Sequence, residues 1–199
     1  MKLYGSTNSG HSYKVKLFLT IAAIKHDYEW VDLALPRNDR APKFVKISPF
    51  GEVPVLTDNN KILCQSNAIL QYLSKEYNKF SGGQKADEWL FWETNRIGFS
   101  LPNYRFAKLW QKQPKDVMTY LLDRLHADLD ILNQHLNHQT FLIDNKFSIA
   151  DISNCAYLYW LEEIEIDVKT YPNVNAWLQL IKLQPNWQSP DILLKTSPL

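Results

Sequence analysis

The stretch Ser48-Pro49-Phe50-Gly51-Glu52-Val53-Pro54-Val55-Leu56 decides how the first part of this sequence is interpreted. Its first four residues have the composition of a tight turn. The apolar residues after them predict a strand over residues 53–57, and residues 61–64 predict a second strand. Asp58-Asn59-Asn60 between the two is a hairpin signal. A turn followed by an antiparallel pair of strands is therefore the starting point.

Outward from this stretch, short strands alternate with helices. Towards the N-terminus, residues 2–4 read as a strand, and helical spacing of apolar residues begins near Tyr13 after a polar loop. Residues 28–33 alternate with period two, as a strand does, and residues 42–47 form a short helix. Towards the C-terminus, Ser66 can cap a helix. The predicted order is βαβαββα, which implies a mixed sheet because a strand-helix-strand crossover pairs strands in parallel.

The pattern changes between residues 78 and 84. Ser81-Gly82-Gly83 interrupts the chain, and no strand pattern follows it. Helical spacing predicts four helices, the first kinked by Pro102, over residues 86–110, 115–137, 149–163 and 173–183.

We therefore predict an α+β protein of two domains. The first is a βαβαββα domain over residues 1–78, followed by a linker over residues 79–85. An all-helical domain occupies residues 86–199.

One local motif stands out in the helical half. Ser148 is a good N-cap, and Asp151, three residues later, can bond back to the amide of Ser148 as in a capping box. Phe147 and Ile152 occupy the positions of a hydrophobic staple around that cap. The motif starts a helix, and we assign it no chemistry.

Composition excludes several classes of protein. The chain has 199 residues, is 45% hydrophobic and 22% charged, and carries a formal net charge of +1. These values are typical of a globular protein, with no global field towards nucleic acid or an anionic membrane. No apolar run reaches the roughly 20 residues that span a bilayer. The N-terminus lacks a signal-peptide core, so we expect a cytoplasmic location.

Metal and disulfide chemistry are not expected. The only cysteines, Cys64 and Cys155, lie far apart in sequence and read as small buried apolar residues. The five histidines form no ligand set with a third partner. We predict no metal site.

Three blocks of sequence together resemble the cytosolic glutathione transferases. They are Leu3-Tyr4 followed by a loop with Ser9, the stretch from Ser48 to Leu56 followed by Gln65-Ser66-Asn67-Ala68-Ile69, and Ser148-Ile149-Ala150-Asp151. The resemblance spans nearly the whole chain and is closest to serine-type bacterial, theta-like and phi-like members. It implies a two-domain glutathione-transferase fold, in which the first domain is thioredoxin-like and binds glutathione.

The resemblance also implies a reaction: glutathione as co-substrate is conjugated to a small hydrophobic electrophile, as in detoxification. Holding glutathione as thiolate at neutral pH requires about 3 kcal/mol, because its thiol pKa must fall by about two units. A hydroxyl donor to the sulfur supplies about 1.5–3 kcal/mol. A helix N-terminus adds about 0.3–1 kcal/mol. Ser9, just ahead of a helix, can provide both.

Ser9 has competitors in the same loop. Ser12 occupies the position where cysteine-type classes carry a reactive thiol, but it can equally be the helix N-cap. Thr7 and Asn8 are further candidates because loop registers are uncertain by a residue or two. No cysteine occurs there, so mixed-disulfide chemistry through the protein's own sulfur is excluded at this position.

The resemblance assigns further residues to glutathione. Val53-Pro54 matches the family's cis-proline, with the Val53 backbone bonding the peptide. Gln65 and Ser66 match the pair that holds the γ-glutamyl end. Arg40 takes the position of the basic residue for the glycyl carboxylate, and Arg37 and Lys43 lie near it in sequence.

Glu52 departs from the family pattern. Many relatives have Lys or Gln just before Val-Pro, whereas a carboxylate repels the glycyl carboxylate. Either Arg40 compensates, or affinity is weaker than usual, or the ligand is different.

The electrophile's pocket is expected against the first long helix. Aromatic residues at helical spacing can line such a pocket or belong to the core; the candidates are Phe99, Tyr104, Phe106 and Trp110. The resemblance further implies a homodimer.

Two other functions fit the same fold. Because fold does not determine function, a non-catalytic protein-interaction module is one alternative, and Glu52 motivates it. Glutathione-dependent reduction of peroxides or disulfides is the other, with bound glutathione supplying the only sulfur.

Overall fold

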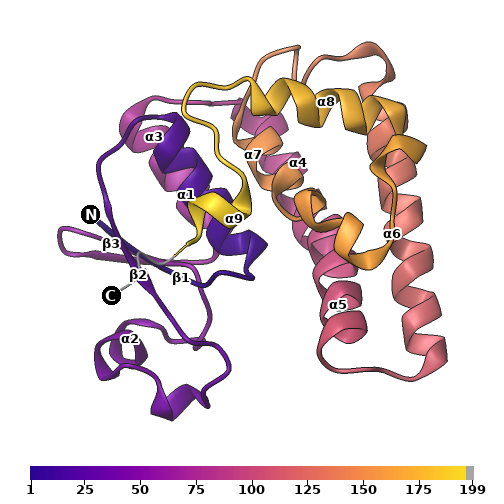
Figure 1. The fold of residues 1–199 in the computed structure, drawn as a ribbon. Coiled ribbons are helices and arrows are strands. Elements are labelled where there is room, and N and C mark those ends of the chain that lie inside the picture. Colours follow the sequence, from indigo (N-terminus) through magenta and orange to yellow (C-terminus); the bar gives the residue numbers. More distant parts are fainter. Residues whose placement is uncertain (196–199) are drawn as a thin grey trace. The chain divides into compact units, whose positions relative to one another are not determined.

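A computed structural model describes residues 1–195 of the chain (Figure 1). The contacts between residues divide it into two units. Unit 1 comprises Met1–Lys79 together with residues 185–195, and unit 2 comprises Phe80–Gln184. Each unit is described by itself below.

Unit 1 is built on a four-stranded sheet. The strand order is β2-β1-β3-β4, in which β1 and β2 are parallel and the other neighbouring pairs are antiparallel. This confirms the predicted βαβαββα order and the mixed sheet. The elements are β1 (Lys2–Gly5), α1 (Gly10–Ile21), β2 (Asp27–Trp30), the 3₁₀ turn η1 (Arg37–Asp39), α2 (Pro42–Ile47), β3 (Val55–Asp58), β4 (Lys61–Cys64) and α3 (Ser66–Tyr77).

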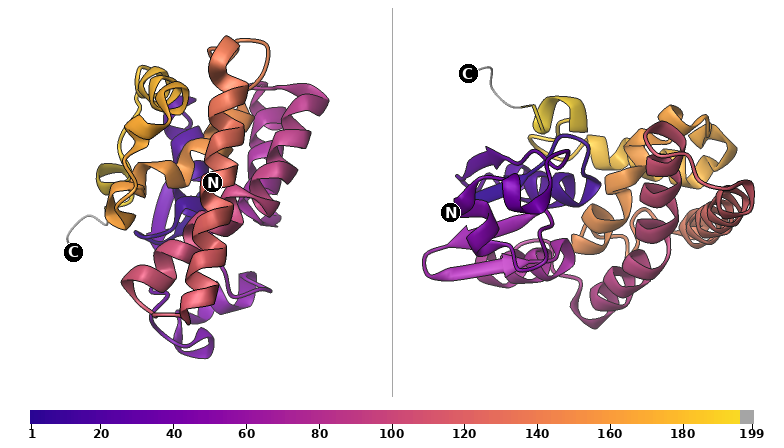
Figure 2. Two further views of the ribbon diagram at one scale, coloured as in Figure 1. Left: turned by 90° about the vertical axis from the view of Figure 1, so that its right-hand side faces the viewer. Right: turned by 90° about the horizontal axis from the view of Figure 1, so that it is seen from below.

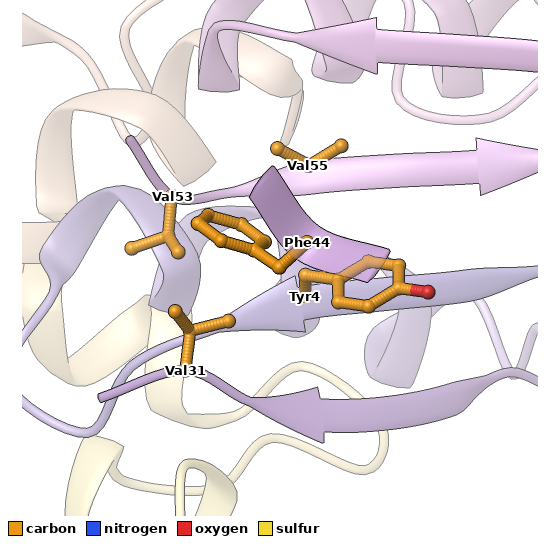
Figure 3. Packing of buried hydrophobic residues seen from close by; sticks show 5 residues of the cluster. All are labelled: Tyr4, Val31, Phe44, Val53 and Val55. Atoms are coloured by element: carbon orange, nitrogen blue, oxygen red, sulfur yellow. The ribbon is translucent and has the colours of Figure 1, made fainter. Parts of the chain in front are cut away.

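The two faces of the sheet are covered by different helices: α1 and α3 lie on one face and α2 on the other (Figure 1). Successive side chains of a strand point to opposite faces. Tyr4 faces α2, where its ring lies 6.1 Å from that of Phe44. These two rings form a buried cluster with Val31, Val53 and Val55 (Figure 3). Burying a side chain such as Phe44 stabilises the unit by about 1.5–3 kcal/mol.

The stretch from Ser48 to Gly51 forms the predicted turn. The amide of Gly51 donates to the carbonyl of Ser48 at 3.1 Å. Gly51 has a φ of +69°, and a Cβ there would lie 2.8 Å from Cδ of Arg37. Only glycine combines that backbone conformation with room for the arginine.

Two strand boundaries differ from the sequence-based prediction. The strand expected at residues 53–57 is observed as Val55–Asp58, because the nitrogen of Pro54 carries no hydrogen for the ladder. The strand expected at residues 28–33 is Asp27–Trp30.

Residues 185–195 pack with the N-terminal unit. They contain α9 (Pro190–Leu193), which contacts α1. The hydroxyl of Tyr13 on α1 donates to the carbonyl of Gln188 at 2.8 Å. This grouping differs from the predicted boundary, which placed all of residues 86–199 in the helical domain. The sequence carries no local sign of this tertiary contact.

Unit 2 is entirely helical. α5 and α6 form an antiparallel pair that stays side by side in every view (Figures 1 and 2). The helices are α4 (Gly83–Asn95), α5 (Ile97–Leu109), α6 (Lys115–His135), α7 (Ile149–Cys155) and α8 (Pro172–Lys182), with 3₁₀ turns η2 (Leu136–His138), η3 (Ala156–Trp160), η4 (Glu162–Ile164) and η5 (Val168–Thr170).

The single helix predicted over residues 86–110 is wrong. The chain breaks at Arg96, whose φ and ψ of −119° and −104° are not helical, and Pro102 lies inside α5. Gly98, in the first turn of α5, leaves space for the buried Glu93 side chain, which a Cβ at Gly98 would overlap. The break therefore lies beside this packing contact and ahead of Pro102, which is inside α5.

The helix predicted over residues 149–163 is too long. α7 ends at Cys155, and 3₁₀ turns follow. In a 3₁₀ turn, residues three apart lie in line, which brings the rings of Tyr157 and Trp160 to 5.8 Å. The start is as predicted: the Ser148 amide donates to Oδ2 of Asp151 at 2.9 Å, which confirms the capping box.

Candidate functional site

The N-terminus of α1 carries the serine that the sequence singles out. Ser9 is the N-cap, and its Oγ accepts from the amide of Ser12 at 3.1 Å. Its side chain is largely buried, with the residue 8% exposed. A serine hydroxyl has one hydrogen and two acceptor positions. No acceptor for the Ser9 hydroxyl hydrogen occurs among residues 1–195, so this hydrogen can serve a ligand.

Ser12 has a different environment. It is fully buried, and its Oγ accepts from the amide of Ser6 at 3.2 Å. A Cβ at Gly5 would lie 2.9 Å from Cβ of Ser12, so the serine packs directly against β1. Ser12 therefore holds the loop before α1 in place. Thr7 and Asn8 are exposed at the tip of that loop.

The first turns of α1 and α3 are tied together. Oγ of Ser66, which opens α3, lies 3.3 Å from Nδ1 of His11. The ammonium of Lys14, which is fully buried, donates to Oδ1 of Asn67 at 3.2 Å. Sequence reasoning assigned no role to His11 or Lys14. Their spacing of three residues, which places them on one face of the helix that Ser9 caps, is the signal that identifies them.

Gln65 joins β4 to α3 in an unusual conformation. Its φ of 69° and ψ of 113° are sparsely populated by residues with a side chain. Its Nε2 donates to Oε2 of Glu52 at 3.2 Å, and both side chains are exposed. The Glu52 carboxylate therefore already has a donor in Gln65.

The residues before β3 leave backbone groups available. The Val53–Pro54 peptide bond is cis. Within the described part of the chain, the N–H and C=O of Val53 make no hydrogen bond. The carbonyl of Glu52 accepts from Oγ of Ser48 at 3.0 Å, which fixes the segment. An extended peptide can therefore pair with Val53 as an added strand does.

Arg40 is committed largely to the protein itself. Its guanidinium donates to the carbonyls of Leu35 at 3.1 Å, Leu33 at 3.3 Å and Gly51. Three of the five donors of an arginine are thus used to hold the loop between β2 and α2. Arg37 is likewise engaged, with the carbonyls of Ser48 and Pro49.

Cys64 does not offer a reactive sulfur to this site. Burial raises the pKa of its thiol, and the negative charge of Glu52 raises it further. A higher pKa leaves less thiolate at neutral pH, and the thiolate is the nucleophile.

The predicted pocket aromatics lie along α5 and just after it. Tyr104 is 8% exposed and belongs to the interior, whereas Phe99, Phe106 and Trp110 are 40–52% exposed. The rings of Phe106 and Trp110 are 5.9 Å apart, while Phe99 lies 5.5 Å from the guanidinium of Arg124. The structure therefore groups Phe106 with Trp110 and separates Tyr104 from them.

Two features are absent from residues 1–195. No three His, Cys, Asp or Glu side chains gather as metal ligands there. None of its helices combines the length and apolar character needed to cross a membrane.

Comparisons with known proteins agree on one family. Residues 1–75 match the model of the glutathione S-transferase N-terminal domain, and residues 97–185 match that of its C-terminal domain. Glutathione S-transferase D6 of Drosophila melanogaster is 30% identical over 155 residues, which cover 73% of this chain and 71% of that protein.

Two further proteins are similar over nearly their full length. The disulfide-bond oxidoreductase YfcG of Escherichia coli is 27% identical, covering 92% of this chain and 89% of that protein. The crystal structure of a possible glutathione S-transferase from Rhodopseudomonas palustris superposes with a TM-score of 0.84 at 30% identity. The superposed region covers 96% of this chain and 97% of the Rhodopseudomonas palustris chain.

Proposed function

The chain belongs to the glutathione S-transferase family, and we propose that it is a glutathione transferase that activates the thiol through Ser9. Its fold is the two-domain fold of that family, with a thioredoxin-like N-terminal domain and an all-α C-terminal domain. The proposed reaction is attack of the glutathione thiolate on a small hydrophobic electrophile, with release of the conjugate. Reduced glutathione prevails in the cytosol, which is where we propose that the reaction takes place.

The observation that carries this proposal is the state of the Ser9 hydroxyl. Its oxygen accepts from the Ser12 amide, which orients the side chain, while its hydrogen stays available. A hydrogen bond from this hydroxyl to the sulfur contributes about 1.5–3 kcal/mol to the thiolate, and the N-terminus of α1 adds about 0.3–1 kcal/mol. Together these approach the stabilisation of about 3 kcal/mol that a pKa shift of two units requires.

We propose partners for the remaining parts of glutathione as well. We propose that Ser66 and Gln65 bind the γ-glutamyl end, because Ser66 opens a helix whose amides favour a carboxylate. The backbone of Val53 takes the cysteinyl unit. Arg40 retains two donors for the glycyl carboxylate, and its other three donors hold the loop between β2 and α2.

Thiolate formation on the protein tests the proposal. Reduced glutathione is titrated into the protein near neutral pH, and the ultraviolet absorbance of the thiolate is followed. We expect a saturable signal that Ser9→Ala abolishes and Ser9→Thr, which keeps a hydroxyl, retains. Ser81→Ala, a change in an exposed loop, is the matched control.

Binding of S-methylglutathione separates two kinds of failure. If Ser9→Ala still binds it but forms no thiolate, the named role of Ser9 stands. An unchanged thiolate signal in Ser9→Ala contradicts that role. If the natural chain binds neither ligand, the proposal of a transferase fails and an interaction module on this fold takes its place.

Disulfide reduction is a second candidate because YfcG, an oxidoreductase, is similar over 92% of this chain. In this reaction bound glutathione thiolate attacks a mixed disulfide of glutathione, forming oxidised glutathione and releasing the substrate thiol. Turnover with such a mixed disulfide, but none with an aryl halide, favours it over conjugation.

We further propose that the protein forms a homodimer and that Phe99, Phe106 and Trp110 bind the electrophile. Large apolar side chains are exposed on both units, including Phe50 at 58% and Phe91 at 75%, and exposed apolar side chains are candidates for an interface. Light scattering that gives a monomer mass at micromolar concentration contradicts the dimer.

A further inference from the structure

A pocket lies on the sheet face of unit 1 that α2 covers, opposite to α1 and α3. Its volume is about 330 Å³, which is within the range of small-molecule sites. None of the residues proposed to bind glutathione lines it. The lining residues are Lys2, Tyr4, Lys43, Ile47, Thr57, Asn59, Asn60, Lys61 and Ile62.

The strand residues reach this pocket because of their register. Lys2 pairs with Thr57 across β1 and β3, and Thr57 pairs with Ile62 across β3 and β4. Directly paired residues share one face of the sheet. Lys43 and Ile47 of α2 form the opposite wall.

The hydroxyl of Tyr4 is a polar group that has no hydrogen-bond partner among the described residues of unit 1. Tyr4 is 1% exposed, and its ring packs with Phe44 in the core cluster. Its hydroxyl points away from the other four side chains of that cluster (Figure 3). Tyr4 lines the pocket, and no hydrogen-bond partner for its hydroxyl occurs among residues 1–195. The hydroxyl oxygen itself is not fully buried, so it is open to the pocket, and a ligand there can accept its hydrogen.

The charge on the pocket wall is positive. Three of its nine lining residues are lysines, and none is acidic. Lys2 pairs with Glu29 at 3.0 Å, and Lys61 lies 3.3 Å from the hydroxyl of Tyr72 and 3.9 Å from Glu76. Lys43 makes no ion pair or hydrogen bond with any described residue, so its charge is available to a ligand.

The uncharged lining residues indicate which other chemical groups the ligand carries. Ile47 and Ile62 offer apolar surface, while the side-chain amides of Asn59 and Asn60 at the hairpin turn offer donors. A ligand that satisfies all of them combines a negative charge with an apolar part.

We propose that this pocket binds a small organic anion, in which a carboxylate or phosphate ester carries an aromatic or short aliphatic group. The anion lies among Lys2, Lys43 and Lys61 and accepts from the hydroxyl of Tyr4. The apolar group lies against Ile47 and Ile62. This site is separate from the glutathione site and does not depend on the protein being a transferase.

The test is a titration of the full chain with phenyl phosphate, followed by the NMR shifts of backbone amides. Benzyl alcohol, which has the ring but no charge, is the control ligand. Tyr4→Phe removes only the hydroxyl and keeps the packed ring. Lys43→Gln removes the free charge, and Lys46→Gln, an exposed α2 lysine outside the pocket, is its matched control.

We expect saturable shifts at residues 2–4, 43–47 and 57–62, and none with benzyl alcohol. Tyr4→Phe and Lys43→Gln should each raise Kd about two- to tenfold, with Lys46→Gln unchanged. The proposal is overturned if these amides do not respond up to the solubility limit of the probe. It is also overturned if both variants bind as the natural chain does. Shifts confined to His11, Gln65 and Ser66, and reversed by S-methylglutathione, would place the probe at the glutathione site and equally overturn it.

Discussion

Replacing Glu52 by glutamine tests the departure from the family pattern most directly. Oε2 of Glu52 accepts from Nε2 of Gln65 at 3.2 Å. A glutamine at position 52 can accept the same bond through its side-chain oxygen. The substitution therefore removes one negative charge and leaves the local hydrogen bonding intact.

The size of the effect follows from this contact. We take the ligand group to be the γ-glutamyl carboxylate of glutathione, which is proposed above to bind at Gln65. If it accepts from the second amide hydrogen of Gln65, it would lie roughly 5 Å from the Glu52 carboxylate, given ordinary hydrogen-bond lengths. Two unit charges at that separation repel by about 1 kcal/mol in water and by about 3 kcal/mol at an effective dielectric constant of 20. Glu52 is exposed, so the lower value applies, and salt reduces it further. We expect Glu52→Gln to bind glutathione roughly fivefold more tightly.

Calorimetric titration with S-methylglutathione at low and high salt measures this effect. The advantage of Glu52→Gln should be largest at low ionic strength and shrink as salt is added, because the repulsion is screened. Glu88→Gln, which removes an exposed charge elsewhere on the chain, is the matched control and should leave Kd unchanged.

Equal affinity of Glu52→Gln and the natural chain at every salt concentration would refute this reasoning. It would mean that the ligand carboxylate does not share Gln65 with Glu52. Weaker binding in the variant would mean that Glu52 itself contacts a cationic part of the ligand, such as its ammonium group.

Three other substitutions test how individual residues contribute to the stability of the fold. Gly5→Ala should lower the free energy of unfolding by about 1–3 kcal/mol, because its Cβ would lie 2.8 Å from the hydroxyl oxygen of Tyr28; denaturant titration measures this. Tyr13→Phe loses the bond to Gln188 and should destabilise unit 1 by about 1 kcal/mol, and amide hydrogen exchange in α9 should rise with it. Burial raises the pKa of Asp128, so its ionised form destabilises the fold above that pKa and the effect disappears as the pH falls through it. Thermal unfolding of Asp128→Asn should therefore show a gain at neutral pH that vanishes in acid.

Features set by neighbouring residues were predictable from the sequence. The turn at Ser48 and the capping box at Ser148 depend on residues within four positions of each other, and both are present. The break at Arg96 was missed, although Gly98, a glycine inside the helical pattern, lies beside it and packs against Glu93.

The candidate site shows the same division. The sequence places Ser9 just ahead of the helix but offers Ser12 as its N-cap. The bond from the Ser12 amide to Oγ of Ser9 identifies Ser9 as the cap, and the packing of Ser12 against β1 separates the two serines. The commitment of Arg40 to three backbone carbonyls is a property of the folded loop, which no sequence pattern encodes.

The bond from Tyr13 to Gln188 bears on the order in which the chain folds during its synthesis. The two residues are 175 positions apart, and domains generally fold as they leave the ribosome, N-terminal first. Residues 80–184 form unit 2, so all of unit 2 has been made before residue 185. Unit 1, although translated first, gains α9 only when residues 190–193 have been made. A nascent chain stalled before Pro185 therefore exposes the surface of α1 that α9 contacts in the folded protein.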